Sequence, residues 1–356
     1  MIELEEESFR RKEDGRQVRP FSQRAGVSNR AYSLPLQRAL ADFGADVPFA
    51  QVPQKMREHY GIEVSASAAR EITERHGELM RQHQEDHLID RLGPEPGWEW
   101  MVSEADGCLI PVVKFGLGEQ AISEQKEPAT VDRRKTKELC WREARLCLAH
   151  EPGQIEPRYA ATLGDVEAVG DRWLDCVARA GAGAATLIHS LGDGAAWIAD
   201  QAERCFGEQG SYLLDFYHVS EYLNAAGKQI APLDAASWRK EQQGRLKETR
   251  LEDVLAELTR HCEPVGTREE DAPVLACHRY LNNHREHLNY KGAIEHGLPI
   301  GSGEIESGHR HVIQARLKRP GAWWKEENAE KMLALRVARA NQEWDSYWQG
   351  QRQGTS

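Results

Sequence analysis

The sequence predicts an α/β protein whose mixed β-sheet carries helices on its faces. The sheet follows a helical N-terminal domain and is interrupted by an all-helical insertion. Three observations support this fold class. Apolar residues recur at helical spacing through residues 31–95. Short apolar runs alternate with amphipathic helical patterns across residues 96–218, which is typical of strands joined by helices. Residues 219–297 then read almost entirely as helix.

Changes in composition mark the expected domain boundaries. The first segment is polar, and the Pro- and Gly-rich stretch LGPEPGWEW separates the helical domain from the strands. We expect the following segments: a poorly ordered N-terminus at 1–30, a helical domain at 31–95, a sheet-based core at 96–218, a helical insertion at 219–297, final core helices at 298–348 and a tail at 349–356.

The N-terminal domain has the outline of two helices joined by a short turn. Val52 and Met56 fall at helical spacing, Gly61 then breaks the helix, and Ser65 or Ser67 can cap a second helix. This outline fits a helix-turn-helix that contacts DNA, and it equally fits two packed scaffold helices. Both interpretations stay open on the sequence alone.

The core shows the order β-β-β-α-β-α-β-α. WEWMVSEADGCLIPVVKF reads as two strands joined by a turn at Asp106–Gly107, because Asp-Gly is favoured in hairpin turns. ELCWREARLCLAHE fits the third strand and also fits a helix, and ATLIHSL reads as the fourth strand. We expect an antiparallel meander followed by strands that alternate with helices, which gives a mixed sheet.

Charge and cysteine usage limit the classes of function. The chain has 57 acidic and 46 basic residues, a net charge of −11, which argues against a purely electrostatic nucleic-acid binder. Its seven cysteines include no C-x-x-C pair and fit reduced thiols rather than a disulfide framework or a zinc ribbon. Zinc at His278, His284 and His287 would lack a second ligand cluster. With no signal peptide or apolar run of about 20 residues, we expect a cytoplasmic protein without a membrane partner.

Carboxylates lie where predicted strands end. Asp106 falls in the first strand pair, Asp193 follows ATLIHSL, and Glu304 and Glu306 begin the helix after the insertion. Three such oxygen ligands suit Mg²⁺ or Mn²⁺, and two ions about 4 Å apart can carry out phosphodiester chemistry. Each acid also has a simpler explanation, a hairpin turn or a helix cap. Their order and placement together favour a metal site.

The stretch LPIGSGEIESGHRHVIQARLKRPGAWW follows its two acids with a run of cations. Such cations are candidates to hold DNA phosphates beside the acids, although a run of charges also fits a solvated helix face. Trp323 and Trp324 are candidates to stack on a distorted base, or else to pack the helix onto the sheet. The candidate DNA-binding residues are Arg310, Arg316, Lys318, Arg319 and Trp324. The cluster Arg133–Lys137 would add to the backbone contacts.

Three motifs together resemble the DDE transposases of bacterial insertion sequences, and among them the Kra-type group related to Mutator-like elements. The motifs are GDGAAWI, LLDFYHVSEYL and GLPIGSGEIESGHRHVIQARLKRPGAWW, and the resemblance covers roughly residues 30–348. It implies an RNase H-like catalytic core interrupted by a helical insertion. It also implies Mg²⁺- or Mn²⁺-dependent cleavage of double-stranded DNA at transposon ends, followed by attack of the freed 3′-hydroxyl on target DNA. Pairing of two ends implies a homo-oligomer when DNA is bound.

The resemblance also implies roles for individual residues. Asp106, Asp193 and Glu306 would be the catalytic, metal-binding triad, with Glu304 as the alternative to Glu306. Asp215, the alternative to Asp193, matches with His218 a D-x-x-H element that would support the site. Members of the family often carry a Cys-rich segment near the N-terminus, whereas the first cysteine here is Cys108.

Two other functions stay open. One is a metal-dependent nuclease on the same fold that lacks strand transfer, and the other is a DNA-binding remnant without activity. The presence of all three acids favours an enzyme over a remnant. The insertion and the D-x-x-H element favour a transposase over a simple nuclease, through the resemblance alone.

Overall fold

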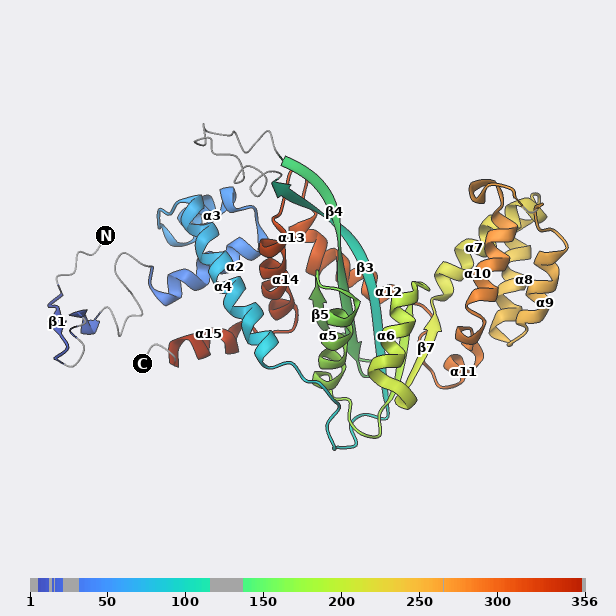
Figure 1. Ribbon diagram of the computed structural model, residues 1–356, viewed down its shortest axis with the longest axis horizontal. Helices are drawn as coiled ribbons and strands as arrows, with labels where there is room; N and C mark the ends of the chain where they lie inside the picture. Colours follow the sequence, from blue (N-terminus) through green and yellow to red (C-terminus); the bar gives the residue numbers. More distant parts are fainter. Residues whose placement is uncertain are drawn as a thin grey trace, which may run out of the picture. The chain divides into compact units, whose positions relative to one another are not determined.

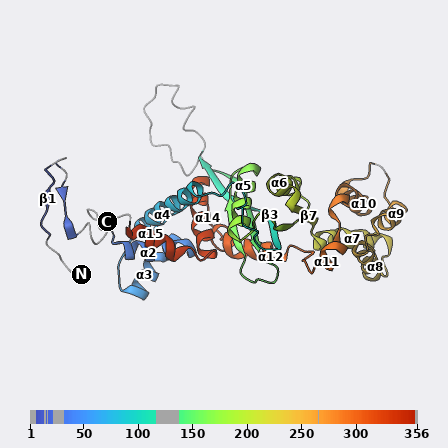
Figure 2. The ribbon, with the colours of Figure 1, turned by 90° about the horizontal axis from the view of Figure 1, so that it is seen from below.

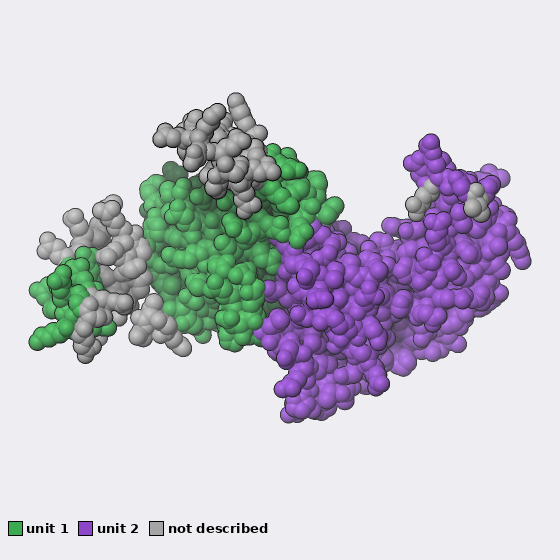
Figure 3. All heavy atoms as spheres, in the orientation of Figure 1, with its two compact units in different colours: residues 1–87, 109–142, 311–356 green, residues 88–108, 143–310 purple. Residues whose placement is uncertain are grey.

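The computed structural model describes residues 6–12, 15, 17–21, 32–115, 137–264 and 266–353. The chain forms two compact units, which Figure 3 shows in different colours. Each unit is assembled from segments that are far apart in the sequence. Unit 1 comprises residues 1–87, 109–142 and 311–356, and unit 2 comprises residues 88–108 and 143–310.

Unit 1 is mainly helical. Its longest helix, α4, packs along α14 and against α2, and Figures 1 and 2 show α4 beside α14 from two directions. Two short strands, β1 (Phe9–Arg10) and β2 (Gln17–Val18), pair antiparallel near the N-terminus. The helices are α2 (Leu34–Asp46), α3 (Val52–Tyr60), α4 (Ala66–Asp86), α14 (Glu326–Ala340) and α15 (Trp344–Gln353), with a 3₁₀ turn at Phe49–Gln51.

The predicted turn between two N-terminal helices is confirmed. Gly61 ends α3 in the left-handed region at φ 66°, a conformation that glycine adopts without the steric cost of a side chain. Ser65 is the cap of α4, because its hydroxyl accepts a hydrogen bond from the amide of Ala68. The outline of a helix-turn-helix is therefore present, and its contact with DNA stays a prediction.

The sheet is five-stranded and mixed, as the sequence predicts. Its order is β5-β4-β3-β6-β7; β4 and β5 are antiparallel, whereas β3, β6 and β7 run parallel to one another. In unit 2, α5 (Val166–Arg179) and α6 (Ala196–Phe206) share a buried apolar cluster with β3 and β6. The strands are β3 (Trp100–Phe115), β4 (Lys137–His150), β5 (Arg158–Thr162), β6 (Leu187–Gly192) and β7 (Gly210–Leu214).

The predicted hairpin at Asp106–Gly107 is wrong. Both residues lie inside the single strand β3, and neither has the positive φ that a two-residue hairpin turn of this type needs. A Cβ at Gly107 would lie 2.4 Å from the Glu143 carboxylate, so any larger residue here would require that flexible side chain to move. The second strand of the sheet is therefore the one predicted as third, and the actual third strand, β5, was not predicted.

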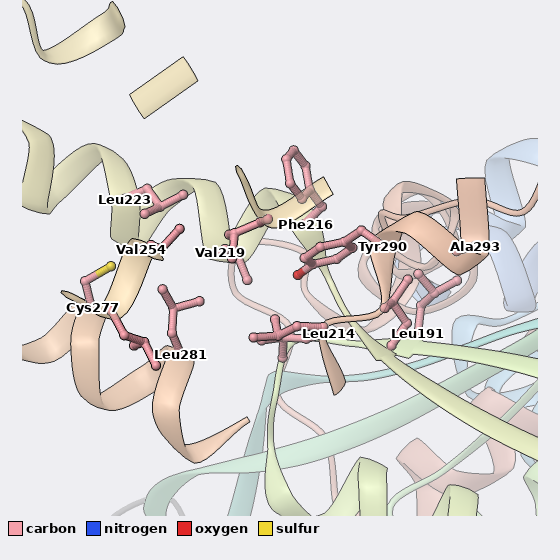
Figure 4. Packing of buried hydrophobic residues seen from close by; sticks show 14 of the residues in the cluster. Leu191, Leu214, Phe216, Val219, Leu223, Val254, Cys277, Leu281, Tyr290 and Ala293 are labelled. Carbon is pink, nitrogen blue, oxygen red and sulfur yellow. The ribbon is translucent and has the colours of Figure 1, made fainter. Parts of the chain in front are cut away.

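The helical insertion shares its core with the sheet of unit 2. Leu191 and Leu214 from the strands pack with Val219 and Leu281 from the helices in one buried cluster (Figure 4). The helical run begins at Phe216, directly after β7. Its helices are α7 (Phe216–Ile230), α8 (Ala235–Lys247), α9 (Leu251–Thr259), α10 (Pro273–Asn283) and α11 (Tyr290–Glu295).

After the insertion the chain forms α12 (Gly303–Gly308), a π-helical segment at His309–Gln314 and α13 (Ala315–Leu317). The six residues from His309 to Gln314, which follow the two glutamates of α12, thus form a wider helical turn than the sequence pattern implies. Within the described part of the chain, no helix is long and apolar enough to cross a membrane.

His76 is the buried polar centre of unit 1. Its ring lies between two partners: Nδ1 is 2.8 Å from the Tyr347 hydroxyl, and Nε2 is 3.0 Å from Gln37 Oε1. A neutral imidazole protonated on Nε2 satisfies both, since it donates to Gln37 and accepts from Tyr347. Burial, together with the nearby charge of Arg75, lowers the pKa of His76 to about 4.

Acid is therefore expected to destabilise unit 1 through His76. When a histidine has a lower pKa in the folded state, protonation favours the unfolded state. The folded state therefore keeps its full stability above the unfolded pKa of about 6.5 and loses stability as the pH falls toward the folded pKa. The loss should approach about 3 kcal/mol near pH 4. Urea denaturation at pH 7 and pH 4.5 measures it. His76→Gln should reduce this pH dependence, whereas His83→Gln, at an exposed site on the same helix, should not. Equal pH dependence in both variants would contradict the assignment.

Candidate functional site

Three aspartates belong to neighbouring parallel strands of the sheet: Asp106 lies within β3, and Asp193 and Asp215 directly follow β6 and β7. The register of β3 with β6, continued past Leu191, places Asp106 level with Asp193. The register of β6 with β7 in the same way places Asp193 level with Asp215. The amide of Asp215 donates to the carbonyl of Gly192 at 2.8 Å, so backbone pairing reaches this level. Because adjacent strands are about 4.8 Å apart, the backbone of Asp193 lies between those of Asp106 and Asp215, about one strand spacing from each.

The phenol of Tyr212 is affected by all three carboxylates. Its hydroxyl accepts a hydrogen bond from the amide of Gly194 at 3.1 Å. Burial raises the pKa of Tyr212, and the negative charges of Asp193, Asp215 and Asp106 raise it further. The acids therefore create a negative potential on this side of the sheet, where a cation would be attracted.

Both carboxylate oxygens of Asp215 accept hydrogen bonds from backbone amides. One carboxylate oxygen accepts from the amides of Tyr217 and His218, which caps α7. The other accepts from the amide and the hydroxyl of Ser302, just before α12. With 3% of its surface exposed, Asp215 is a structural clamp, whereas the His218 side chain lies near the surface, 3.9 Å from Glu221. The accessory role expected for both residues stays a prediction.

Asp106 is paired with a histidine that was not singled out from the sequence. Asp106 Oδ1 accepts from the amide of Gly107 at 2.7 Å, and Oδ2 lies 3.2 Å from Nε2 of His309. His309 is 3% exposed. Burial lowers the pKa of His309, but its interactions with Asp106 and Cys108 outweigh burial and raise it to about 9. A protonated His309 therefore places a buried positive charge beside the Asp106 carboxylate.

The two glutamates of α12 have different surroundings. Glu304 Oε2 lies 3.0 Å from Nε2 of His150, a buried residue at the end of β4. The Glu306 side chain is 66% exposed, and its carboxylate lies 3.6 Å from Arg310. Among the described residues, no group of three His, Cys, Asp or Glu side chains is placed to hold a metal ion. The strands therefore place Asp106 and Asp193 at one height of the sheet. Neither Glu304 nor Glu306 completes a metal-binding group with them among the described residues.

A buried glutamate attaches α12 to the sheet. Glu104, on β3, is 1% exposed, and its Oε2 accepts from the amide of Ile305 at 2.7 Å. Burial raises the pKa of Glu104 to about 8. The period-two pattern of a strand places Glu104 on the same face as Asp106, and His309 stands three residues after Glu306 on a helix. Those two spacings were the available sequence signals for the residues that were missed.

The candidate DNA-binding residues divide into exposed and buried groups. Arg310 and Lys318 are exposed and Arg319 is half-buried. Arg316 is buried between the rings of Phe49 and Trp324. Trp324 is itself buried and donates from Nε1 to the carbonyl of Leu317, so it packs within unit 1. The neighbouring Trp323 is the exposed indole, at 44%. Of the Arg133–Lys137 cluster, all but Lys137 lie outside the described residues.

Comparison with known proteins finds similarity over the C-terminal half of the chain. The profile of a family described as "Uncharacterised protein family (UPF0236)" matches residues 182–351. A protein of Streptococcus gallolyticus described as "UPF0236 protein in vanSb 3'region" is 30% identical over 165 residues. That alignment covers 46% of this chain and 35% of the relative, so the chain spans about a third of the relative's length. The matched range holds Asp193, Asp215 and Glu306 but begins after Asp106.

Replacement of Asp215 by Asn is expected to destabilise unit 2. The amide group of Asn would face donors from α7 or from Ser302 and leave buried N–H or O–H groups without an acceptor. The expected loss is at least about 2 kcal/mol of unfolding free energy. Thermal and urea denaturation measure it against Asp234→Asn, because Asp234 precedes α8 without a side-chain cap hydrogen bond. Similar stability of the two variants would show that the clamp contributes little.

Proposed function

We propose that this protein is a DDE transposase that cuts DNA at transposon ends in a metal-dependent reaction and joins the freed 3′-hydroxyl to target DNA. The supporting observation is the parallel register of β3 and β6, which pairs Glu104 with Leu191 and, continued by two residues, sets Asp106 level with Asp193. The sheet order β5-β4-β3-β6-β7, with the first strand in the centre and the fourth and fifth parallel to it, supports an RNase H-like core. The motifs that resemble those of insertion-sequence transposases contain Asp193, Asp215 and Glu306.

The side chains of this site offer the carboxylate oxygens that Mg²⁺ prefers, but among the described residues no three of them are grouped to hold a metal ion. Asp106 and Asp193 offer hard carboxylate oxygens and are neither fully buried nor fully exposed. We propose Glu306 as the third ligand; its side chain is 66% exposed and its carboxylate lies 3.6 Å from Arg310. Bound Mg²⁺ would activate the attacking hydroxyl and stabilise the leaving oxygen.

The other residues of the site have positioning roles in this proposal. His309 lies 3.2 Å from one oxygen of Asp106, and this ion pair limits the orientations of the carboxylate. Glu104 fixes the start of α12 against β3 through the amide of Ile305. Arg310 lies one helical turn from Glu306, where its charge can meet a DNA phosphate.

Asp106→Asn and Asp193→Asn are each expected to lower Mn²⁺-dependent nicking of supercoiled plasmid by at least about 100-fold, because each removes a charged oxygen ligand. Binding of DNA in EDTA should stay unchanged. Asp200→Asn, on the exposed side of α6, is the matched control and should nick like the wild type. Wild-type nicking by Asp106→Asn would overturn the catalytic assignment. Joining of a 3′-hydroxyl end to plasmid separates a transposase from a simple nuclease.

The choice between the two glutamates can be tested separately. Glu306→Gln should abolish nicking, since it removes the proposed third ligand. Glu304→Gln should retain most of the activity, because Glu304 is already paired with His150. Nicking rates at saturating Mn²⁺ and the Mn²⁺ concentration for half-maximal rate distinguish them. The opposite ranking of the two variants would assign the ligand to Glu304.

A further inference from the structure

Unit 1 contains a cavity of about 450 Å³ that the catalytic proposal does not use. Its walls come from the turn at Phe49, from α4, from β3 and β4, and from the segment around residues 316–328. All of these belong to unit 1. Cavities of roughly 300–1,000 Å³ are the size that small ligands and single nucleotides occupy.

The cavity is strongly cationic in a chain that is acidic overall. The single carboxylate in its wall, Glu74, accepts a hydrogen bond from the side-chain amide of Asn328 at 3.0 Å. Five cationic side chains also line the cavity, whereas the whole chain has a net charge of −11. Such a local excess attracts an anion. The cations are Arg70, Lys137, Arg316, Arg319 and Lys325.

Arg316 has an unused donor in this wall. Its Nε donates to the carbonyl of Gly44 at 3.0 Å, and its guanidinium lies between two aromatic rings, 4.8 Å from that of Phe49 and 4.7 Å from that of Trp324. Its Nη2 is buried and has no hydrogen-bond partner among the described residues. A buried charged donor without an acceptor is costly, so an anionic ligand would stabilise this arrangement.

An exposed indole stands beside these charges. Trp323 is 44% exposed, and Nζ of Lys137 lies 5.8 Å from the centroid of its ring. Trp323 belongs to the cavity wall together with Arg319. An aromatic surface next to a cationic groove is the combination that holds single-stranded nucleic acid, where bases stack on the ring and phosphates meet the cations.

We propose that this cavity binds one unpaired nucleotide of a DNA strand. Its phosphate lies against Arg316, Arg319 and Lys137, and its base stacks on Trp323. The base must be unpaired, because a base inside a duplex is already stacked on both faces. The proposal rests on the proposed function in taking DNA as the ligand, but it requires neither the metal nor cleavage.

The test is binding of fluorescein-labelled dT15 to the full chain in EDTA, followed by anisotropy. Trp323→Ala should weaken binding about tenfold, and Trp323→Phe should restore most of it, because a base stacks on either ring. The matched control Trp141→Ala removes another exposed indole of unit 1, outside the cavity, and should bind like the wild type. A duplex of equal length should be much less sensitive to Trp323→Ala. Equal losses with Trp141→Ala, or with the duplex, would overturn the proposal.

The phosphate contact has its own readout. Arg319→Ala should lower the slope of log affinity against log salt by about 0.7, the value for one phosphate contact to a single strand. Lys240→Ala, which removes an exposed charge from α8, should leave the slope unchanged. Competition with dTMP and with inorganic phosphate identifies the source of the ligand, and displacement of dT15 at equal concentration would assign the cavity to a free nucleotide.

The outcomes also separate this proposal from the catalytic one. If Asp106→Asn nicks like the wild type while dT15 binding depends on Trp323, the cavity assignment stands and the catalytic one fails. If nicking depends on Asp106 while dT15 binding ignores Trp323 and Arg319, the catalytic assignment stands and the cavity does not bind the strand.

Discussion

The carboxylate of Asp215 is the contact on which the arrangement of the acidic site depends. It caps α7 and binds the backbone of Ser302, 87 residues later in the chain. One side chain therefore fixes both the start of the helical insertion and the point where the chain returns to the sheet. Since the buried carboxylate satisfies several backbone and side-chain donors at once, it defines the position of α12 more sharply than apolar packing alone would.

The contacts around the site also counter the repulsion among its acids. Asp106, Asp193 and Asp215 lie on neighbouring strands, with the buried Glu104 two residues from the first of them. Each of these acids has a partner: His309 for Asp106, backbone amides for Asp215 and Glu104, and the amide of Ala195 for Asp193. A cation bound beside the aspartates would further reduce this repulsion, which connects the stability of the site with the proposed chemistry.

The sequence predicted the elements more reliably than their connections. Short apolar runs that alternate with amphipathic patterns predicted β6, β7 and the helices after them, and the end of a predicted strand identified Asp193. These signals are local in the sequence. Asp106 was found through a turn that does not exist, because an Asp-Gly pair favours a hairpin only when its backbone is free to take positive φ. His309 and Glu104 were missed because their importance comes from contacts across the fold. Burial likewise decides between Trp323 and Trp324, and no local pattern separates two adjacent tryptophans.

Insertions and deletions have different consequences for the three aspartates, because only Asp106 lies inside the unbroken strand β3. Asp106 lies inside a 16-residue strand, whereas Asp193 and Asp215 follow strand ends. A one-residue insertion or deletion in β3 before Asp106 would turn its side chain to the opposite face of the sheet. The number of residues in the insertion between Asp215 and Ser302 is not restricted in this way, because only the two ends of the insertion must meet. Variation in length can therefore accumulate in the helical insertion, while the first half of β3 must keep its residue count.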